Sequence, residues 1–305
     1  MASDRLSTNL GKMALRSPLI AASGTVGSVW EWADVADVSV YGAAVAKSVA
    51  AEPWPGRPPP RLGPTGVGML NGIGIQNPGI DAWLTDTAHR LQPLDVPIWG
   101  STVGSTPEDF AKVAAGLAGA GLAAVEVNLS CPNLEDGRMF SLDAGPSAEV
   151  VRAVAEAVSV PVGAKLSPNT DDIVGVAALC VEAGADFVTL TNSVMGFGIN
   201  LEKRRPVLSG GVGGYSGPGL KPISLRCVYE VARAMPDTPI VGCGGVTSGR
   251  DVVEYVLAGA SAVEVGTLHF ADPKAGARLV REIKTELDRQ GVPTLSDLRG
   301  AVESW

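Results

Sequence analysis

Residues 124–133 read Ala-Val-Glu-Val-Asn-Leu-Ser-Cys-Pro-Asn, the clearest strand signal in the chain. Ala124, Val125 and Val127 form an apolar run with β-branched side chains, which favours a buried strand. Pro132 cannot continue a ladder of strand hydrogen bonds, so the strand ends before it and Cys131 lies in the following loop. This part of the sequence therefore predicts a buried strand that delivers polar side chains at its carboxyl end.

The polar cluster at this strand end has a specific chemical character. Asn128 and Asn133 flank Cys131, and each carboxamide offers both a hydrogen-bond donor and an acceptor. Two carboxamides around one thiol suit a heterocycle with alternating donors and acceptors. The alternative interpretation is a strand end with a buried structural cysteine.

Composition limits the classes of function. The 305 residues are 46% hydrophobic and 18% charged, with 38 Gly and 22 Pro, which is typical of a soluble globular protein with a large core and many turns. A net charge of −8 gives no basic footprint for nucleic acid. No apolar run approaches the roughly 20 residues that cross a membrane, and residues 1–10 lack the pattern of a signal peptide. We expect a cytoplasmic protein that binds neither nucleic acid nor a membrane.

The four cysteines have no metal-site spacing. No Cys-x-x-Cys pair occurs among Cys131, Cys180, Cys227 and Cys243, so we predict no metal and a reducing compartment. Cys180 and Cys227 fall in helix-like segments and Cys243 falls in a strand-like run. All three are interpreted as core residues.

Short apolar runs alternate with helical segments along the chain, after a small hairpin predicted at 6–15. The predicted strands are 19–22, 43–47, 97–101, 124–128, 162–165, 187–192, 240–244 and 262–266. The predicted helices are 107–120, 147–158, 171–183, 222–234, 248–258 and 272–290. Capping residues mark the helix starts near Thr106, Asn169 and Asp272.

This alternation predicts a closed parallel (β/α)₈ TIM barrel, in one domain spanning 1–305. A doubly wound open sheet is the alternative, but no Gly-x-Gly-x-x-Gly turn follows the first strand. Long insertions at 50–77, 134–146 and 193–222 all follow strands. They therefore lie on the face where such barrels keep their active sites.

Several predicted strands end in residues that suit an anionic ligand. Lys47 and Lys165 end apolar strands, where a lysine must be paired or must serve a negative ligand. Gly244-Gly245 and Gly266-Thr267 follow the last two strands, the usual phosphate position of this fold. The Gly-rich run 210–219 is interpreted either as a third wall of that phosphate site or as a flexible loop.

Five motifs together resemble the dihydroorotate dehydrogenases over nearly the whole chain. The motifs are Asn128-Leu-Ser-Cys-Pro-Asn133, Asn71-Gly-Ile-Gly-Ile-Gln-Asn77, Ala164-Lys-Leu-Ser-Pro-Asn169, Ser216-Gly-Pro-Gly-Leu-Lys-Pro222 and Gly244-Gly-Val246. The cysteine in the first motif makes the chain resemble the soluble class 1 branch of this family. Pro58-Pro-Pro-Arg61 and Asn192-Ser-Val-Met-Gly196 resemble its NAD-linked 1B catalytic subunit most.

The resemblance implies FMN-dependent oxidation of dihydroorotate to orotate in pyrimidine biosynthesis. It implies that Cys131 is the base, and that Lys47 and Lys165 assist near the substrate and the flavin. The substrate-binding residues that it implies are Lys47, Asn71, Ile73, Gly74, Ile75, Asn128, Asn133, Asn192 and Ser193. The FMN-binding residues that it implies are Ser23, Gly24, Lys47, Ser48, Ser101, Asn128, Lys165, Thr191, Ser216, Gly217, Gly244, Gly245, Gly266 and Thr267.

The sequence departs from the 1B pattern at three places. Ser101 stands where Asn is usual, Gly72 replaces a common Ala, and residues 135–138 differ after the Cys-Pro-Asn motif. A different electron acceptor, such as fumarate, or another dihydropyrimidine substrate, such as dihydrouracil, stays an alternative. A Schiff-base aldolase that uses Lys165 and a non-enzymatic scaffold are the remaining hypotheses. The expected partners are a second copy of the chain and an electron-transfer subunit with FAD and an iron–sulfur cluster.

Overall fold

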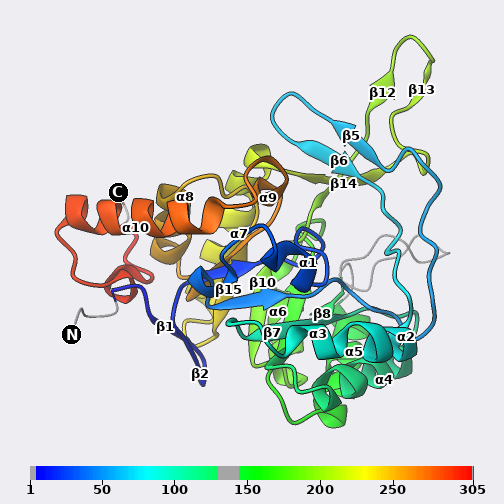
Figure 1. Ribbon diagram of the computed structural model, residues 1–305. Coiled ribbons are helices and arrows are strands. Elements are labelled where there is room, and N and C mark those ends of the chain that lie inside the picture. Colours follow the sequence, from blue (N-terminus) through cyan, green and yellow to red (C-terminus); the bar gives the residue numbers. More distant parts are fainter. Residues whose placement is uncertain (1–4, 130–143, 304) are drawn as a thin grey trace.

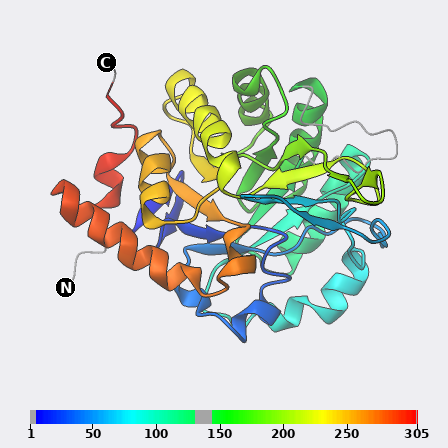
Figure 2. The ribbon, with the colours of Figure 1, turned by 90° about the horizontal axis from the view of Figure 1, so that it is seen from above.

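The computed structural model describes residues 5–129, 144–303 and 305. Its centre is a closed barrel of eight parallel strands, ringed by helices (Figures 1 and 2), which confirms the predicted fold. The barrel strands are β3 (Leu19–Ala21), β4 (Ala43–Val45), β7 (Ile98–Thr102), β8 (Ala124–Asn128), β9 (Val162–Leu166), β10 (Phe187–Leu190), β15 (Ile240–Cys243) and β16 (Ala262–Val265).

The six predicted helices are all present, with small differences at their ends. They are α4 (Pro107–Gly119), α5 (Ala144–Ala157), α6 (Ile173–Glu182), α7 (Lys221–Ala234), α8 (Gly249–Leu257) and α10 (Ala275–Gln290). Thr106 caps α4 in a capping box, and Asp172 caps α6 by accepting from Gly175 N.

The prediction of one helix over 272–290 was wrong at its start. Asp272 ends a separate short helix, α9 (Leu268–Ala271), and α10 begins after Lys274 without a side-chain cap. Several short elements between barrel strands and at the C-terminus were not predicted from the sequence. These are α1 (Trp30–Ala33), η1 (Val38–Val40), α2 (Ile80–Asp86), α3 (Ala88–Leu91), η3 (Pro218–Leu220) and η4 (Leu295–Leu298).

The predicted N-terminal hairpin closes one end of the barrel. β1 (Thr8–Leu10) pairs antiparallel with β2 (Met13–Leu15). Leu10 and Leu15 pack with the barrel residues Trp99 and Phe187 in one buried cluster. Because successive strand residues alternate in direction, this apolar layer fills the barrel at the hairpin end.

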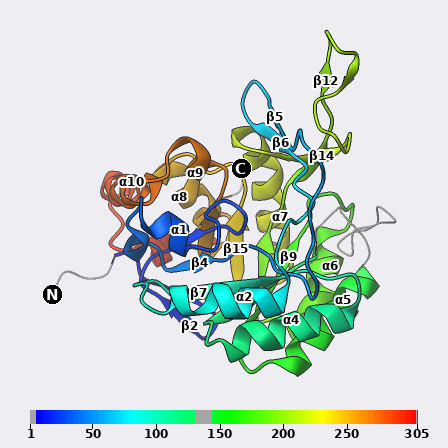
Figure 3. The same ribbon diagram turned by 45° about the vertical axis from the view of Figure 1, so that its right-hand side comes forward.

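Two of the long insertions build a second sheet beyond the other end of the barrel (Figures 1 and 3). Its strand order is β11 (Val194–Gly196), β14 (Gly213–Ser216), β6 (Met69–Asn71) and β5 (Leu62–Pro64). The ribbon from β12 (Ile199–Asn200) to β13 (Arg205–Pro206) projects from it. Part of the Gly-rich run 210–219 is therefore strand β14 rather than a flexible loop.

Close contacts with neighbouring atoms explain why this run is rich in glycine. A Cβ at Gly213 would lie 2.3 Å from Asn71 O, and a Cβ at Gly214 would lie 2.1 Å from Ser193 Oγ. Glycine thus lets β14 pack closely on both neighbours. Among the described residues, no helix combines the length and the apolar character that crossing a membrane requires.

Candidate active site

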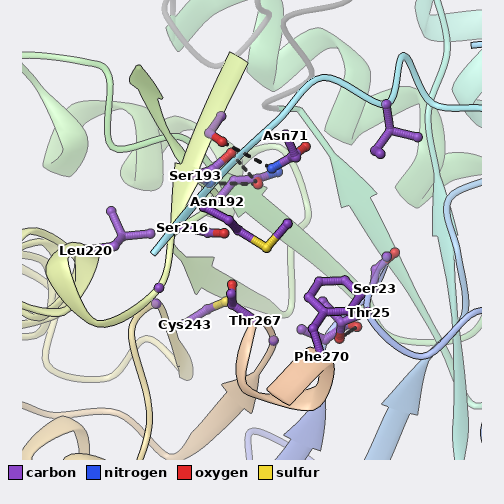
Figure 4. Close-up of a pocket in the computed structure, with 18 of the residues that line it drawn as sticks. Ser23, Thr25, Asn71, Asn192, Ser193, Ser216, Leu220, Cys243, Thr267 and Phe270 are labelled. Carbon is purple, nitrogen blue, oxygen red and sulfur yellow. Dashed lines mark hydrogen bonds between the residues drawn. The ribbon is translucent and has the colours of Figure 1, made fainter. Parts of the chain in front are cut away.

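A pocket opens at the barrel end beneath the second sheet, with a cavity volume of about 620 Å³ (Figure 4). That volume lies in the range of ordinary cofactor and substrate sites. The structure brings the described residues of the predicted site together along this pocket. They are Ser23, Gly24, Lys47, Ser48, Asn71, Ile73, Gly74, Ile75, Ser101, Asn128, Lys165, Thr191, Asn192, Ser193, Ser216, Gly217, Gly244, Gly245, Gly266 and Thr267.

Two predicted residues lie outside the described part of the chain. Cys131, the predicted base, and Asn133, a predicted substrate contact, fall within residues 130–143. The described strand β8 ends at Asn128, which lines the pocket. The predictions for Cys131 and Asn133 therefore stay predictions.

A chain of hydrogen bonds orders the amides on one wall of the pocket. Asn192 Oδ1 accepts from Ser193 N at 2.7 Å, and Asn192 Nδ2 donates to Asn128 Oδ1 at 3.2 Å. Asn128 Nδ2 donates in turn to Ser48 Oγ at 3.4 Å, and Ser48 Oγ lies 2.8 Å from Ser101 Oγ. Each amide has one orientation in this chain because its oxygen and nitrogen face different partners.

Lys165 lies at the bottom of the pocket in a cluster of buried charges. Its Nζ lies 2.5 Å from Glu264 Oε2 and 3.3 Å from Glu126 Oε1, and Thr189 Oγ1 donates to Glu126 Oε2 at 3.0 Å. Both glutamates are fully buried, and Lys165 is 5% exposed. A partner for Lys165 was expected from the sequence, but neither glutamate was among the predicted site residues.

The alternation of side chains along a strand could have identified both glutamates as residues that point into the barrel. Glu126 lies two residues before Asn128, and Glu264 lies two residues before Gly266, so each points into the barrel as those pocket residues do. A charged residue inside an apolar strand needs a buried partner of opposite charge. Lys165, at an inward position of β9, is that partner for both.

The two carboxyl groups have opposite pKa shifts. Burial, followed by the charge of Glu264, raises the pKa of Glu126 to about 8. Burial disfavours the ionised form of Glu264 too, but the Lys165 charge and hydrogen bonds from its neighbours outweigh it and lower the Glu264 pKa. The two carboxylates hold the pKa of the Lys165 ammonium above its ordinary value despite its burial. Of the two carboxyl groups, Glu126 therefore binds a proton more readily, while the surroundings of Lys165 favour its positive charge.

The position of Cys243 differs from its interpretation as a core residue alone. It ends β15 and is buried, as expected of a core residue, but it also lines the pocket and points into it (Figure 4). A cysteine other than Cys131 therefore lies at the carboxyl end of a barrel strand. Burial raises the Cys243 pKa well above its ordinary value, so this thiol is neutral.

The glycines expected to hold a phosphate line the pocket directly after β14, β15 and β16. Gly217 and Gly245 have φ angles of +109° and +68°. A Cβ at Gly217 would lie 2.7 Å from Gly68 Cα, and one at Gly245 would lie 2.6 Å from Lys221 N. Only glycine fits both positions, so backbone rather than side chains forms this wall. Such a wall suits a phosphate group.

His269, which the sequence placed in no motif, supports the loop after β16. Thr25 Oγ1 donates to Ala22 O at 2.9 Å, so His269 Nδ1, 3.1 Å away, must donate to Thr25 Oγ1. His269 Nε2 then accepts from Tyr41 Oη at 2.9 Å. Burial lowers the His269 pKa to about 4, so the imidazole is neutral. This relay ties α9 to the β3 loop, and both Thr25 and the start of α9 line the pocket.

Apolar side chains that were not predicted from the sequence also line the pocket. Leu62, Met69, Leu220 and Phe270 line it, and the side chains of Leu62 and Phe270 are 53% and 59% exposed. Figure 4 shows Phe270 and Leu220 on different sides of the pocket. These residues lie in the insertions and in α9, where no periodic pattern marks a pocket wall. Within the described ranges, no group of three or more His, Cys, Asp or Glu side chains is placed to hold a metal ion.

The comparisons with known proteins agree on one family. A family model described as dihydroorotate dehydrogenase matches residues 5–287. Proteins from a Geobacter species and from Citrifermentans bemidjiense are each 43% identical over 300 residues, covering 98% of both chains. A protein from Alkaliphilus metalliredigens is 40% identical over 298 residues, covering 97% of this chain and 98% of the relative. All three are named dihydroorotate dehydrogenase B (NAD(+)), catalytic subunit.

A solved structure supports the fold. The crystal structure of the dihydroorotate dehydrogenase of Eimeria tenella in complex with ferulenol aligns with a TM-score of 0.82 at 20% sequence identity. The alignment covers 98% of this chain and 89% of that chain.

Proposed function

The chain belongs to the dihydroorotate dehydrogenase family, and we propose that it holds FMN in the pocket at the barrel mouth and uses Cys131 as the catalytic base. It is an oxidoreductase that converts dihydroorotate to orotate in pyrimidine biosynthesis. The names of the relatives do not favour dihydrouracil as the substrate, and an enzyme of this family is neither an aldolase nor a scaffold. The whole span 1–305 acts as one FMN-binding domain, and its cytoplasmic location stays a prediction.

The residues of the pocket suit the two ends of FMN. The wall around Gly217 and Gly245 holds the phosphate, since only glycine fits at these two positions and the backbone there can approach a bulky anion. Lys165 places a fixed positive charge at the pocket floor, where it stabilises the negative charge of a reduced isoalloxazine ring. Bound FMN supplies the acceptor for the hydride that leaves C6 of dihydroorotate.

The amides and Cys131 act on the substrate. Asn71 and the ordered pair Asn128–Asn192 bind the polar edges of the pyrimidine, helped by Ser193, by Asn133 and by the backbone of 73–75. Cys131 removes the proton from C5. A thiol with an ordinary pKa near 8.5 is a few per cent ionised at neutral pH, which is enough for a positioned base. Lys47 lies in the same pocket and stabilises the substrate carboxylate.

One observation carries this proposal: the described residues of five separate family motifs and strand ends converge on a single pocket. The experiment is anaerobic. The purified chain should be yellow, and its flavin absorbance should bleach when dihydroorotate is added. A colourless protein that takes up no FMN, or a flavin that dihydroorotate leaves oxidised, would contradict the proposal.

The route of electrons beyond FMN needs a partner. A [2Fe–2S] or [4Fe–4S] cluster takes four cysteine ligands, and three of the four cysteines lie apart in α6, α7 and β15. The three relatives described above are named as catalytic subunits of an NAD(+) enzyme. We therefore propose that the chain works with an electron-transfer subunit carrying FAD and an iron–sulfur cluster. We also propose, from the family resemblance alone, that the chain forms a homodimer.

A further inference from the structure

The charged cluster in the barrel contains more acid than base. Glu126, Glu264 and Lys165 come from β8, β16 and β9 and meet inside the barrel, between the apolar layer at the hairpin end and the pocket. With all three groups ionised, the cluster carries one positive and two negative charges. Such an uncompensated charge is costly in a buried site, because water cannot screen it.

One carboxylate oxygen in this cluster points to the missing proton. Glu264 Oε1 is buried, and no donor in the described ranges reaches it in good hydrogen-bond geometry. The groups beside Glu264 that could supply a proton are the Glu126 carboxyl and the weakly donating Cys243 thiol, and only a proton on Glu126 would also reduce the excess negative charge. The other three carboxylate oxygens of the pair each have a partner: Lys165 Nζ for Glu264 Oε2 and Glu126 Oε1, and Thr189 Oγ1 for Glu126 Oε2. A buried acceptor without a donor is rare and costly. A proton on the neighbouring Glu126 carboxyl supplies that donor and removes the excess charge in one step.

We propose that Glu126 and Glu264 share a single proton at the floor of the pocket, and that this proton sets the net charge that the cluster of Glu126, Glu264 and Lys165 presents to the flavin. The proposal rests on the proposed FMN site for its consequence but not for the proton itself. Glu126 and Glu264 are positioning residues here, because they act on the cofactor through Lys165.

Among the described residues, the other titratable groups that act on the pair are Lys165 and Cys243. Lys165 faces it from β9 and Cys243 from β15, while β10 and β7 contribute the non-ionising side chains of Thr189 and Ser101. The Cys243 thiol is neutral, because burial raises its pKa. The raised pKa of Glu126, about 8, agrees with a proton that stays at neutral pH and leaves in alkali.

The shared proton has a measurable consequence for the cofactor. Above the pKa of Glu126 the cluster has lost its proton while the bound flavin is oxidised. When reduction places a negative charge nearby, that pKa rises, and Glu126 takes one proton from the solvent. The flavin midpoint potential then falls more steeply with pH above about 8, by one additional proton per two electrons.

The first measurement does not need bound flavin. The infrared spectrum of the chain should contain the C=O band of a protonated carboxyl group at neutral pH, and that band should disappear as the pH rises past about 8. Glu126→Gln should remove the band. Glu264→Gln should remove it too, since Glu126 then becomes the sole anion beside Lys165 and ionises. Glu286→Gln, the same change at a buried glutamate on α10 outside the barrel, should keep the band.

The second measurement uses the FMN-loaded protein. The potential of the wild type and of Glu286→Gln should steepen with pH above about 8, whereas that of Glu126→Gln should not. Cys243→Ala should keep the steepening, which separates the carboxyl proton from the thiol. The double variant Glu126→Gln/Glu264→Gln leaves Lys165 without an anion and should raise the potential.

Two results would overturn the inference: a wild-type protein with no protonated-carboxyl band at neutral pH, or a steepening that survives in Glu126→Gln. Failure to bind FMN has a different meaning. It would contradict the proposed function, and the infrared measurement would still decide whether the two glutamates share a proton.

Discussion

Asn192 Nδ2 donates to Asn128 Oδ1 across 3.2 Å, joining the ends of two barrel strands that are not neighbours in the sheet. This hydrogen bond fixes where the nitrogen and the oxygen of each amide point. Ser193 N holds the Asn192 oxygen on one side, and Ser48 receives the Asn128 nitrogen on the other. The pocket wall is thus ordered before a substrate arrives.

Asn192→Asp tests that order. A carboxylate in place of the amide faces the Asn128 oxygen and the anionic substrate with a like charge, so the KM for dihydroorotate should rise at least tenfold, about 1.4 kcal/mol. Steady-state kinetics with an artificial acceptor measure it. Asn9→Asp, an exposed change in the N-terminal hairpin, is the control. An unchanged KM in Asn192→Asp would remove this wall from substrate binding.

The two thiols of the site region should differ in importance. Cys131→Ala should abolish flavin reduction by dihydroorotate and leave FMN bound, because the base is gone. Cys131→Ser should keep a slow rate that rises with pH, since a hydroxyl is a weaker base. Cys243→Ala should slow reduction far less, because burial keeps that thiol neutral. Anaerobic stopped-flow spectroscopy gives all three rates. If Cys243→Ala abolishes flavin reduction and Cys131→Ala does not, Cys243 rather than Cys131 is the base.

Lys165→Ala should affect both stability and the flavin. It leaves two buried glutamates without their cation, and breaking a buried ion pair costs about 3–5 kcal/mol. FMN should bind more weakly, and the flavin potential should fall. Urea unfolding and redox titration measure the two effects. Lys112→Ala breaks an exposed ion pair with Glu52 and should change stability by less than about 1 kcal/mol. Wild-type FMN occupancy and potential in Lys165→Ala would exclude the flavin role.

His269 should make the protein sensitive to acid. Its pKa is lowered from 6.5 to about 4 in the folded state, so the unfolded chain binds the proton first as the pH falls. The stabilising contribution is fully present above pH 6.5 and is lost as the pH falls towards about 4, by up to about 1.4 kcal/mol per pH unit. His269→Asn should flatten this dependence in urea unfolding and weaken FMN binding. His89→Asn, at an exposed histidine on α3, should do neither. Equal slopes in the two variants would be the contrary result.

The isolated chain should oxidise dihydroorotate with artificial acceptors and reduce NAD⁺ poorly. The reason is that no dinucleotide fingerprint occurs in the sequence, so the chain has no recognisable site of its own for NAD⁺. Steady-state assays with NAD⁺, fumarate and a quinone check this. Fast NAD⁺ reduction by the lone chain would refute the need for a partner, and fast fumarate reduction would indicate a homodimeric enzyme with that acceptor.

Local sequence determined the barrel and most of the pocket. β-Branched runs such as 124–128, alternating with capped helices such as α4, leave few folds other than a parallel barrel. The residues at the ends of those strands must then meet at one mouth, as Asn128, Lys165 and Thr191 do. Strand ends are readable because the chain itself marks where apolar runs stop.

Only the tertiary structure decided what surrounds Lys165. Glu264 lies 99 residues away from it in sequence, on a strand that is not its neighbour in the sheet, and no local pattern says which inward side chains meet across the barrel. The same holds for β14, where Gly213 and Gly214 belong to a strand only because β6 and β11 pack against them. Burial and long-range pairing arise from the closed sheet as a whole. They set the charge balance of the site, since a carboxyl group keeps its proton only where the fold has removed the water.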